Sequence, residues 1–336
     1  MEHRFKDAVL GGVLGGAVGD ALGMPFEGLP SKSIAEKYHR IDYYLPGRKG
    51  TPLQTLRPGQ YTDDTQLVVA TLNAFQQGYS IARLVHEFKL LFPNIRGAGK
   101  STYTALNNLV NDCSPKKSGD LLGIGCGAIT RVFPFVALRY GDDDITACEN
   151  EIASAVQITH NNKTATSAAL ITSGILEKLV ELDANYFNRK KNRLDFISKI
   201  IECPMNETPE LKQLQRNLMN VKNILQNKRP NILDLREKLG STGKIMELLP
   251  SSLCFFLLSS ESYLSSVSDA IMLGGDTDSR AALTGIFSGV YLGKSKIPEY
   301  LLTGLEKHSE LERLASDLAS SIERRFSGIS RYRRSN

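Results

Sequence analysis

Apolar residues recur at helical spacing along nearly the whole chain. Between Phe5 and Ala17 they fall three or four positions apart, as in a helix that buries one face. The same spacing recurs in further stretches rich in Ala, Leu and Ile: 67–74, 84–91, 145–158, 165–179, 262–272 and 281–292. Alternating β-branched residues bounded by turns, which would mark strands, are almost absent. The pattern therefore predicts an all-α fold, with one compact multi-helix domain over residues 1–326.

Two segments interrupt this helical pattern. Residues 24–60 contain five prolines and several glycines, which predicts a long loop with one short helix near 33–38. Residues 183–243 are rich in Lys, Asn, Glu and Gln, but they keep helical apolar spacing between Leu211 and Leu225. We interpret this second segment as surface helices that form a cap or an insertion.

Composition narrows the class of protein. With 41% hydrophobic residues among 336, the chain can build a full core, which excludes disorder as its main state. The apolar stretches 8–19, 248–260 and 281–293 are each shorter than the roughly 18–20 residues that a bilayer requires, so we expect no membrane span. The first stretch is interrupted by glycines and follows Asp7, so we interpret it as a helix of the mature protein, not as a secretion signal.

Five arginines among the last thirteen residues account for the formal net charge of +5, because the basic and acidic residues of the rest of the chain balance. A basic tail can bind nucleic acid, but no aromatic platform or nucleic-acid motif accompanies it. We therefore predict a flexible, solvated tail over residues 327–336 and no nucleic-acid partner. The five cysteines are widely spaced and form no CxxC pair, which gives no support to a zinc or dithiol site and favours a reducing compartment, the cytoplasm.

Two predicted helix starts, far apart in the sequence, each carry a pair of acids. Thr62-Asp63-Asp64-Thr65 follows a loop that ends at Gly59, and Gly274-Gly275-Asp276-Thr277-Asp278-Ser279 opens a later helix. Helix capping and the helix dipole explain each start alone, but not the repetition. If the two starts meet, four carboxylates converge and repel one another unless cations lie between them. Carboxylate and hydroxyl oxygens suit Mg²⁺, Mn²⁺ or Ca²⁺, so capping and a binuclear metal site both remain open.

These two elements and Gly15-Gly16-Ala17-Val18-Gly19-Asp20-Ala21-Leu22-Gly23 resemble the ADP-ribosylglycohydrolase family. This family includes the dinitrogenase reductase-activating glycohydrolases and the ADP-ribosyl-acceptor hydrolases, and the resemblance runs in order from about Phe5 to about Leu318. It implies an all-α fold with two Mg²⁺ or Mn²⁺ ions. By position, the resemblance implies these metal ligands: Thr62, Asp63, Asp64, Asp276, Asp278 and Ser279, the last of which is often Thr in relatives.

The resemblance also implies an activity, the removal of ADP-ribose from a modified protein or small molecule, with protein arginine first among the acceptors. Glu27 matches a family glutamate near the metals and the substrate, and with Asp63 and Asp276 it is a candidate catalytic residue; without the family it is a loop-surface acid. We expect Asp20 to hold the first helix and the loop together. Arg280 faces either a phosphate or an acidic neighbour. The alternative function is a catalytically silent relative that binds ADP-ribose or is structural.

Gly97, Ala98 and Gly99 precede a predicted helix and match a family Gly-Ala-Gly loop that lies against the substrate. Together with the following Lys100, the segment resembles the end of a phosphate-binding P-loop motif. However, Asn94 stands where that motif requires glycine, and no strand precedes it, so we reject a nucleotide triphosphatase. A simple turn between helices is the alternative to a substrate loop.

Gly125, Cys126 and Gly127 precede a predicted helix at 129–140 and are similar to a family Gly-Asn-Gly loop, in which Cys126 replaces the Asn. The resemblance places this loop and His160 at the substrate, with the histidine near a ribose. A capping or core histidine is the alternative for His160.

Overall fold

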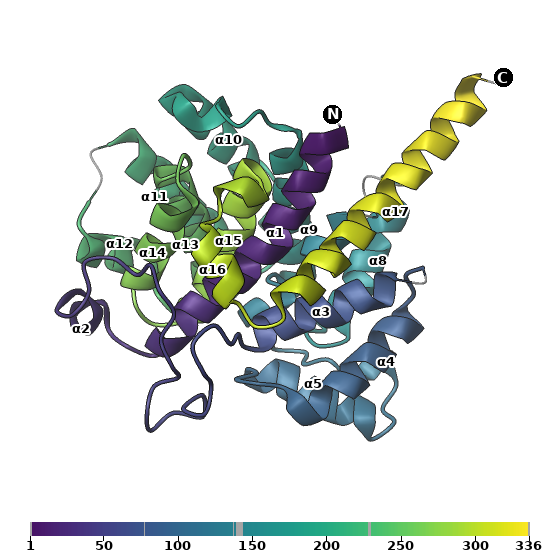
Figure 1. Ribbon diagram of the computed structural model, residues 1–336, viewed down its shortest axis with the longest axis horizontal. Coiled ribbons are helices and arrows are strands. Elements are labelled where there is room, and N and C mark those ends of the chain that lie inside the picture. Colours follow the sequence, from purple (N-terminus) through teal and green to yellow (C-terminus); the bar gives the residue numbers. More distant parts are fainter. Residues whose placement is uncertain (1, 77, 137, 139–143, 228–229, 335–336) are drawn as a thin grey trace.

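The computed structural model describes residues 2–76, 78–136, 138, 144–227 and 230–334 of the chain. This part of the protein is all-α, as predicted, and its extended segments form isolated β-bridges in place of a sheet (Figure 1).

The first half of the chain contains the helices α1 (Glu2–Gly23), η1 (Met24–Phe26), α2 (Ser31–Ala35), α3 (Asp63–Phe75), α4 (Ile81–Leu91), η2 (Phe92–Asn94), α5 (Lys100–Val110), α6 (Pro115–Ser118), η3 (Cys126–Ala128), η4 (Phe133–Phe135), α8 (Ile145–Gln157) and α9 (Lys163–Glu181). The second half contains η5 (Tyr186–Asn188), α10 (Lys190–Ile201), α11 (Pro209–Gln226), α12 (Ile232–Leu239), α13 (Ile245–Leu258), α14 (Tyr263–Met272), α15 (Thr277–Leu292), η6 (Lys294–Lys296), α16 (Glu299–Gly304) and α17 (His308–Arg334).

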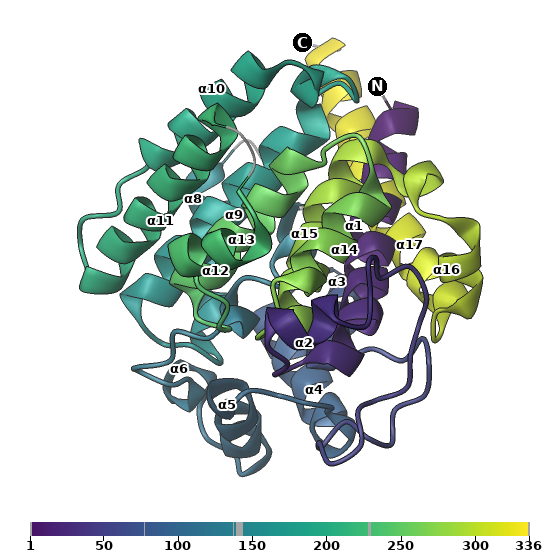
Figure 2. The same ribbon diagram turned by 90° about the vertical axis from the view of Figure 1, so that its left-hand side faces the viewer.

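The helices α1 and α15 lie side by side and antiparallel at the centre, and every residue of α15 is buried (Figure 1, Figure 2). Small residues four positions apart line their contact: Gly11 with Gly289, Gly15 with Gly285, Gly19 with Ala281, and Gly23 with Thr277. A Cβ added at any of these four α1 glycines would overlap backbone of α15. Only glycine allows so close an approach, and the approach brings the end of α1 to the start of α15.

By length and composition α1 could cross a membrane. Its apolar segment lies within residues 4–26 and is longer than the 8–19 stretch noted in the sequence. In the protein, 94% of that segment is buried among the other helices. It therefore serves as the central core helix.

The predicted helix at 129–140 is wrong over its first half. Residues 129–131 form a turn, and Phe133–Phe135 forms a 3₁₀ helix. Pro134 has no backbone N–H to donate and disfavours α-helical geometry at Phe133, which explains the interruption. Residues 137, 139 and 140 of this prediction lie outside the described part of the chain.

The segment 183–243 contributes to the core as well as to the surface. Helix α11 packs against α13, and its buried residues join the main hydrophobic cluster. The long loop and the short helix predicted within 24–60 are present as η1, α2 and irregular chain. Helix α17 continues to Arg334 and so includes most of the segment 327–336, for which the sequence predicts a flexible tail; residues 335–336 lie outside the described part.

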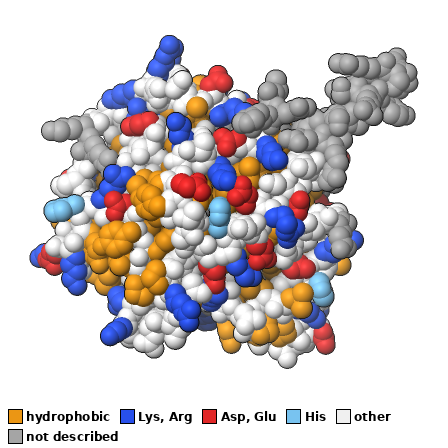
Figure 3. Space-filling view, viewed as in Figure 1, with side chains coloured by type: hydrophobic (Ala, Val, Ile, Leu, Met, Phe, Trp, Pro, Cys, Tyr) orange, Lys and Arg blue, Asp and Glu red, His pale blue; other side chains and the backbone are white. Residues whose placement is uncertain are grey.

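The outer surface is mixed in character. On the face drawn in Figure 3, acidic and basic side chains are interspersed over much of the surface, and hydrophobic side chains gather toward the left, where Figure 1 shows α2 and the long loop.

Candidate functional site

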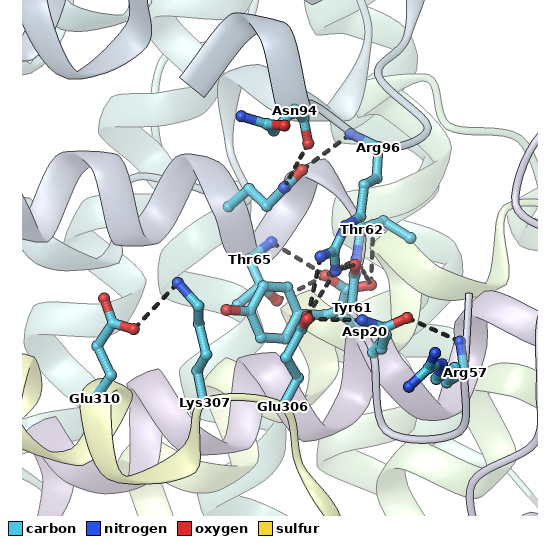
Figure 4. A network of polar contacts seen from close by, with 12 residues as sticks. Asp20, Arg57, Tyr61, Thr62, Thr65, Asn94, Arg96, Glu306, Lys307 and Glu310 are labelled. Carbon is cyan, nitrogen blue, oxygen red and sulfur yellow. Dashed lines mark hydrogen bonds and ion pairs between the residues drawn. The ribbon is translucent and has the colours of Figure 1, made fainter. Parts of the chain in front are cut away.

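The buried carboxylate of Asp20, near the end of α1, fixes the start of α3 (Figure 4). Its oxygens accept hydrogen bonds from the backbone N of Thr62 at 3.0 and 3.1 Å and from the Thr62 hydroxyl at 2.9 Å. They also accept from the backbone N and the hydroxyl of Thr65, at 3.0 and 2.6 Å. Thr62 makes no capping bond with its own side chain, so Asp20 caps α3 from another helix. The expected role of Asp20 in holding the first helix and the loop together is confirmed.

An ion pair holds the same loop from its outer side. The Arg96 guanidinium binds Glu306 at 2.6 and 3.1 Å and donates to the backbone O of Tyr61 (Figure 4). The backbone O of Arg96 accepts from the backbone N of Asp63 at 2.8 Å. The chain around residue 96 is thus attached directly to the first turn of α3.

The structure brings the two acidic helix starts together. Asp63, Asp64 and Asp278 are only 9%, 4% and 6% exposed. Burial, together with Asp20 and Asp276, raises the pKa of Asp64 to about 7, and the nearby hydroxyls of Thr130 and Ser279 partly oppose this rise. Asp276 and Ser279 of the second start thus act on the pKa of an acid in the first start.

Asp63 of the first start and Asp278 of the second start also have raised pKa values. Burial and the charges of Asp64, Asp20 and Asp276 raise the pKa of Asp63 well above its usual value. Burial raises the pKa of Asp278 in the same way, with Asp276 as the next largest cause. Acids that raise one another's pKa across two remote segments form one cluster of negative charge.

Glu27 lies at the exposed edge of this acid cluster. Partial burial and the charge of Asp276 raise the pKa of Glu27, and Arg48 opposes the rise. The loop that carries Glu27 is attached to the second acidic start, because the backbone N of Gly28 donates to Gly275 O and the backbone N of Gly275 donates to Leu29 O, both at 2.8 Å. Glu27 is therefore held beside the cluster in spite of its position in a long loop.

Arg280 is fully buried behind the second acidic start. Its guanidinium donates to the backbone O of Gly274 at 2.7 Å and to the Ser251 hydroxyl at 3.0 Å. Burial lowers the pKa of Arg280 to about 10, still high enough to keep it charged. Within the described part of the chain it forms no ion pair with an acid. It holds the turn at Gly274, which has a φ of 72° and so favours glycine.

The loop at Gly97, Ala98 and Gly99 opens α5 and lies near Thr62. A Cβ added at Gly97 would lie 3.8 Å from the Thr62 Cβ, and the φ of 76° at Gly97 favours glycine. The loop therefore borders the first acidic start, as expected for a loop beside the site.

The second glycine loop faces His160. A Cβ at Gly125 would lie 3.4 Å from His160 Nε2, and one at Gly127 would lie 3.5 Å from His160 Cε1. His160 is only 1% exposed, and its Nδ1 lies 2.8 Å from the Thr159 hydroxyl. Burial lowers the pKa of His160 to about 3, so the ring is neutral near pH 7 and serves as a hydrogen-bonding group.

Cys126 lies against the second acidic start. Its Sγ is 3.3 Å from the Ser279 hydroxyl and 3.7 Å from Asp276 Oδ2. Burial and the neighbouring charges of Asp276 and Asp64 raise the pKa of Cys126 well above its usual value, which keeps the thiol protonated. The loop expected at the substrate thus also borders the acid cluster.

The sequence matches the family model for ADP-ribosylglycohydrolase over residues 1–327. The chain belongs to the ADP-ribosylglycohydrolase family. It is 28% identical over 323 residues to an uncharacterized protein of Archaeoglobus fulgidus, covering 95% of this chain and 96% of that protein. It is also 29% identical over 184 residues to a putative ADP-ribosyl glycohydrolase, L543, of Acanthamoeba polyphaga mimivirus, covering 51% of this chain and 53% of that one.

The fold is shared with a solved structure. A chain described as part of an ADP-ribosylglycohydrolase-related protein complex matches with a TM-score of 0.69 and 23% identity, covering 95% of this chain and 99% of that chain. Family membership supports a hydrolase of the ADP-ribosyl glycohydrolase type.

A third loop borders the site and was missed in the sequence. The backbone O of Ser241 accepts from the backbone N of Asp276 at 2.9 Å, and Gly243 O accepts from Cys126 N at 2.8 Å. Glu247 holds the loop, because its Oε2 accepts from the backbone N of Ser241 at 3.0 Å. A Cβ at Gly243 would overlap Asp276 Oδ2. The sequence signal was the glycine pair before an apolar helix, the same pattern that marks the other site loops.

The donor chemistry of the acid cluster suits hard divalent cations. The six implied ligands offer only carboxylate and hydroxyl oxygens, and no Lys or Arg of the described part forms an ion pair with Asp63, Asp64, Asp276 or Asp278. The described residues contain no preformed group of three or more His, Cys, Asp or Glu side chains that could hold a metal ion. The fit to Mg²⁺ or Mn²⁺ thus rests on the oxygen chemistry of these residues and on the lack of a basic ion-pair partner among the described residues, and not on a preformed arrangement of side chains.

Proposed function

We propose that this protein hydrolyses the bond between C1″ of ADP-ribose and a modified acceptor, with protein arginine as the first candidate, and that it uses two Mg²⁺ or Mn²⁺ ions. The observation that carries the proposal is the convergence of two remote acidic helix starts, 62–64 and 276–279, whose acids raise one another's pKa and have no basic ion-pair partner among the described residues. Family membership supplies the reaction class.

The residues proposed to hold the ions are Thr62, Asp63, Asp64, Asp276, Asp278 and Ser279. When bound, such ions supply Lewis-acid charge and lower the pKa of a water. The chain itself orients these ligands. The Thr62 hydroxyl donates its hydrogen to Asp20, so the lone pairs of its oxygen remain available to coordinate a cation. The backbone N of Ser279 bonds Asp276 Oδ1 at 3.3 Å, which limits the rotation of that carboxylate.

We assign the transfer of a proton to the leaving group to the carboxyl groups at the edge of the cluster. Hydrolysis breaks the bond from C1″ to the acceptor nitrogen, adds the hydroxyl of water to C1″, and places a proton on the leaving nitrogen. Glu27 is suited to transfer that proton, because its raised pKa brings the carboxyl closer to the pH at which it exchanges protons readily. Asp63 and Asp276 are the alternative groups for this transfer.

The glycine loops are proposed to bind the rest of ADP-ribose. Backbone N–H groups at Gly97–Gly99, which open α5, and at Gly125 and Gly127 can donate to pyrophosphate and ribose oxygens. The neutral ring of His160 lies against the second loop and can accept or donate one hydrogen bond to a sugar hydroxyl. These contacts would hold C1″ at the acid cluster.

The test is the release of ADP-ribose from ADP-ribosylated arginine, with and without Mg²⁺ or Mn²⁺. We expect release only with the cation, a loss of about 100-fold or more in kcat for Asp63→Ala and Glu27→Gln, and no change for the exposed control Glu237→Ala. Glu27→Gln should still bind the cation in calorimetry, which separates proton transfer from metal binding. Absence of release from arginine, serine and O-linked substrates would favour a catalytically silent relative.

A further inference from the structure

A separate pocket lies on the outer side of the turn that carries Glu27. It has a volume of about 380 Å³ and lies between η1, α2 and the loop at residues 45–49. Figure 2 shows α2 and this loop on the face of the protein turned to the viewer. We call it the α2 pocket. Its volume falls in the range of small-molecule sites.

The α2 pocket combines an apolar lining with aromatic rings. Phe26, Ile34 and Leu45 are among its lining residues, and Phe26 and Ile34 are fully buried in the core. The ring of Tyr38 also lines it and meets Phe26 edge-on, with ring centroids 5.3 Å apart. Because Phe26 and Ile34 are buried, the surface open to a flat apolar ring is that of the partly exposed Tyr38 and Leu45.

Three basic side chains, Lys37, Arg48 and Lys49, also line the α2 pocket, and its lining contains no acid. Lys37 and Lys49 form no ion pair within the described part of the chain. Arg48 donates from Nη2 to the backbone O of Glu27 at 2.8 Å, which fixes the guanidinium at the pocket while its other N–H groups have no hydrogen bond to the described residues. The pocket thus presents three positive charges without a partner in its lining.

A second, larger cavity of the protein is different in charge. This cavity, of about 660 Å³, lies among α8, α9 and α10, and its two lysines, Lys178 and Lys199, are matched by Glu149 and Glu207 in the same lining. Lys178 also pairs with Glu181 at 2.6 Å. The excess of positive charge therefore distinguishes the α2 pocket from this larger cavity.

We propose that the α2 pocket binds a nucleotide, with its phosphate at Lys37, Arg48 and Lys49 and its base against the apolar and aromatic lining. Guanidinium and ammonium groups are the usual partners of phosphate in proteins, and Arg offers several donors to one phosphate. A nucleoside monophosphate has both groups that this lining can bind: a flat base for the apolar and aromatic side chains, and a doubly charged phosphate for the basic side chains. The site is distinct from the acid cluster, which repels phosphate.

The test is a calorimetric titration of the full chain with AMP, in EDTA so that no cation bridges the phosphate to the acid cluster. We expect the double variant Lys37→Ala/Lys49→Ala to lose at least about tenfold in AMP affinity at one site, because two of three phosphate partners are gone. Lys32→Ala, on α2 but outside the pocket, and Lys199→Ala, in the larger cavity, should titrate like the original protein. Arg48 is left unchanged because it contacts Glu27.

Two further probes separate the parts of the ligand. Adenosine and inorganic phosphate should each bind more weakly than AMP, and adenosine binding should be insensitive to the double variant. An AMP titration that the double variant leaves unchanged, or the absence of AMP binding to the original protein, would overturn the proposal. Because the titration measures binding without hydrolysis, its outcome is independent of the proposed activity.

Discussion

A single carboxylate, that of Asp20, holds the start of α3 in place by accepting hydrogen bonds from Thr62 and Thr65. It is buried, which raises its pKa, and hydrogen bonds from Thr65 and Thr62 oppose that rise. The two backbone N–H groups that it accepts from belong to the first turn of α3, where no helical partner is available. One residue of α1 thereby fixes the direction in which Asp63 and Asp64 leave the loop.

Removal of this carboxylate should destabilise the protein. Asp20→Ala leaves buried N–H and hydroxyl donors of Thr62 and Thr65 without an acceptor, and we expect the free energy of unfolding to fall by about 3 kcal/mol or more. Asp20→Asn keeps one acceptor oxygen and should lose less. Urea denaturation measures both changes.

The exposed residue Glu237 provides the control for this prediction. Glu237→Ala should change the free energy of unfolding by less than about 0.5 kcal/mol. A loss for Asp20→Ala as small as that of the control would contradict the role assigned to Asp20.

At the scale of elements, the contact between α1 and α15 decides where the site lies. The small residues at 11, 15, 19 and 23 let the two helix backbones touch, and the antiparallel register puts Gly23 at Thr277. The Thr277 hydroxyl donates to Gly23 O at 2.8 Å, which closes this end of the contact. The helix pair thereby places the end of α1, which carries Asp20, at the start of α15, which Asp276 precedes.

An added methyl group in this contact should force the two helices apart. Gly19→Ala places a Cβ onto the backbone O of Ala281, and neither backbone can move without disturbing the core. We expect a loss of about 2–3 kcal/mol in unfolding free energy and a lower midpoint in thermal denaturation.

Gly174→Ala on α9 is the matched control, because the same change there meets open space. This substitution should stabilise the protein by about 0.5–1 kcal/mol, since alanine is the better helix former. Equal effects of Gly19→Ala and Gly174→Ala would show that the α1–α15 contact is less tight than the structure indicates.

The elements themselves were largely predictable from the sequence. Long periodic stretches such as 165–179 and 262–272 correspond to α9 and α14, because one buried face leaves a clear apolar spacing. The helix expected at 129–140 was wrong over its first half, because Pro134 outweighs an apolar stretch that suits a helix. The contribution of Ser241 and Gly243 to the site was not predicted, because their role depends on what packs against them.

At the scale of the whole molecule, the site is assembled from remote parts of the chain. Its acids come from residues 62–64 and 276–278, and Arg96 ties the first of these segments to Glu306 near the start of α17. Ligands so far apart in sequence are close only in the folded state. Any cation held by both segments therefore binds the folded protein far better than the unfolded chain.

Divalent cations should consequently raise the thermal stability of the whole protein. At a concentration about 100 times the dissociation constant, Mg²⁺ or Mn²⁺ should add about 2.7 kcal/mol, seen as a rise in Tm of several degrees over the protein in EDTA. Asp278→Ala, which removes one proposed ligand, should reduce or abolish the rise. NaCl at matched ionic strength serves as the control, and an equal Tm in EDTA and in both cations would contradict the proposed metal site.

The sequence by itself determined the helices, the two acidic helix starts and the family, because periodicity, capping residues and ordered motifs are local features of the chain. Only the tertiary structure decided that the acids of both starts form one cluster, that Arg280 turns away from them toward Gly274, and that the loop at Ser241–Gly243 borders the site. These outcomes depend on how closely two central helices approach, and that approach follows from side chains absent at glycines that lie more than 250 residues apart in the chain.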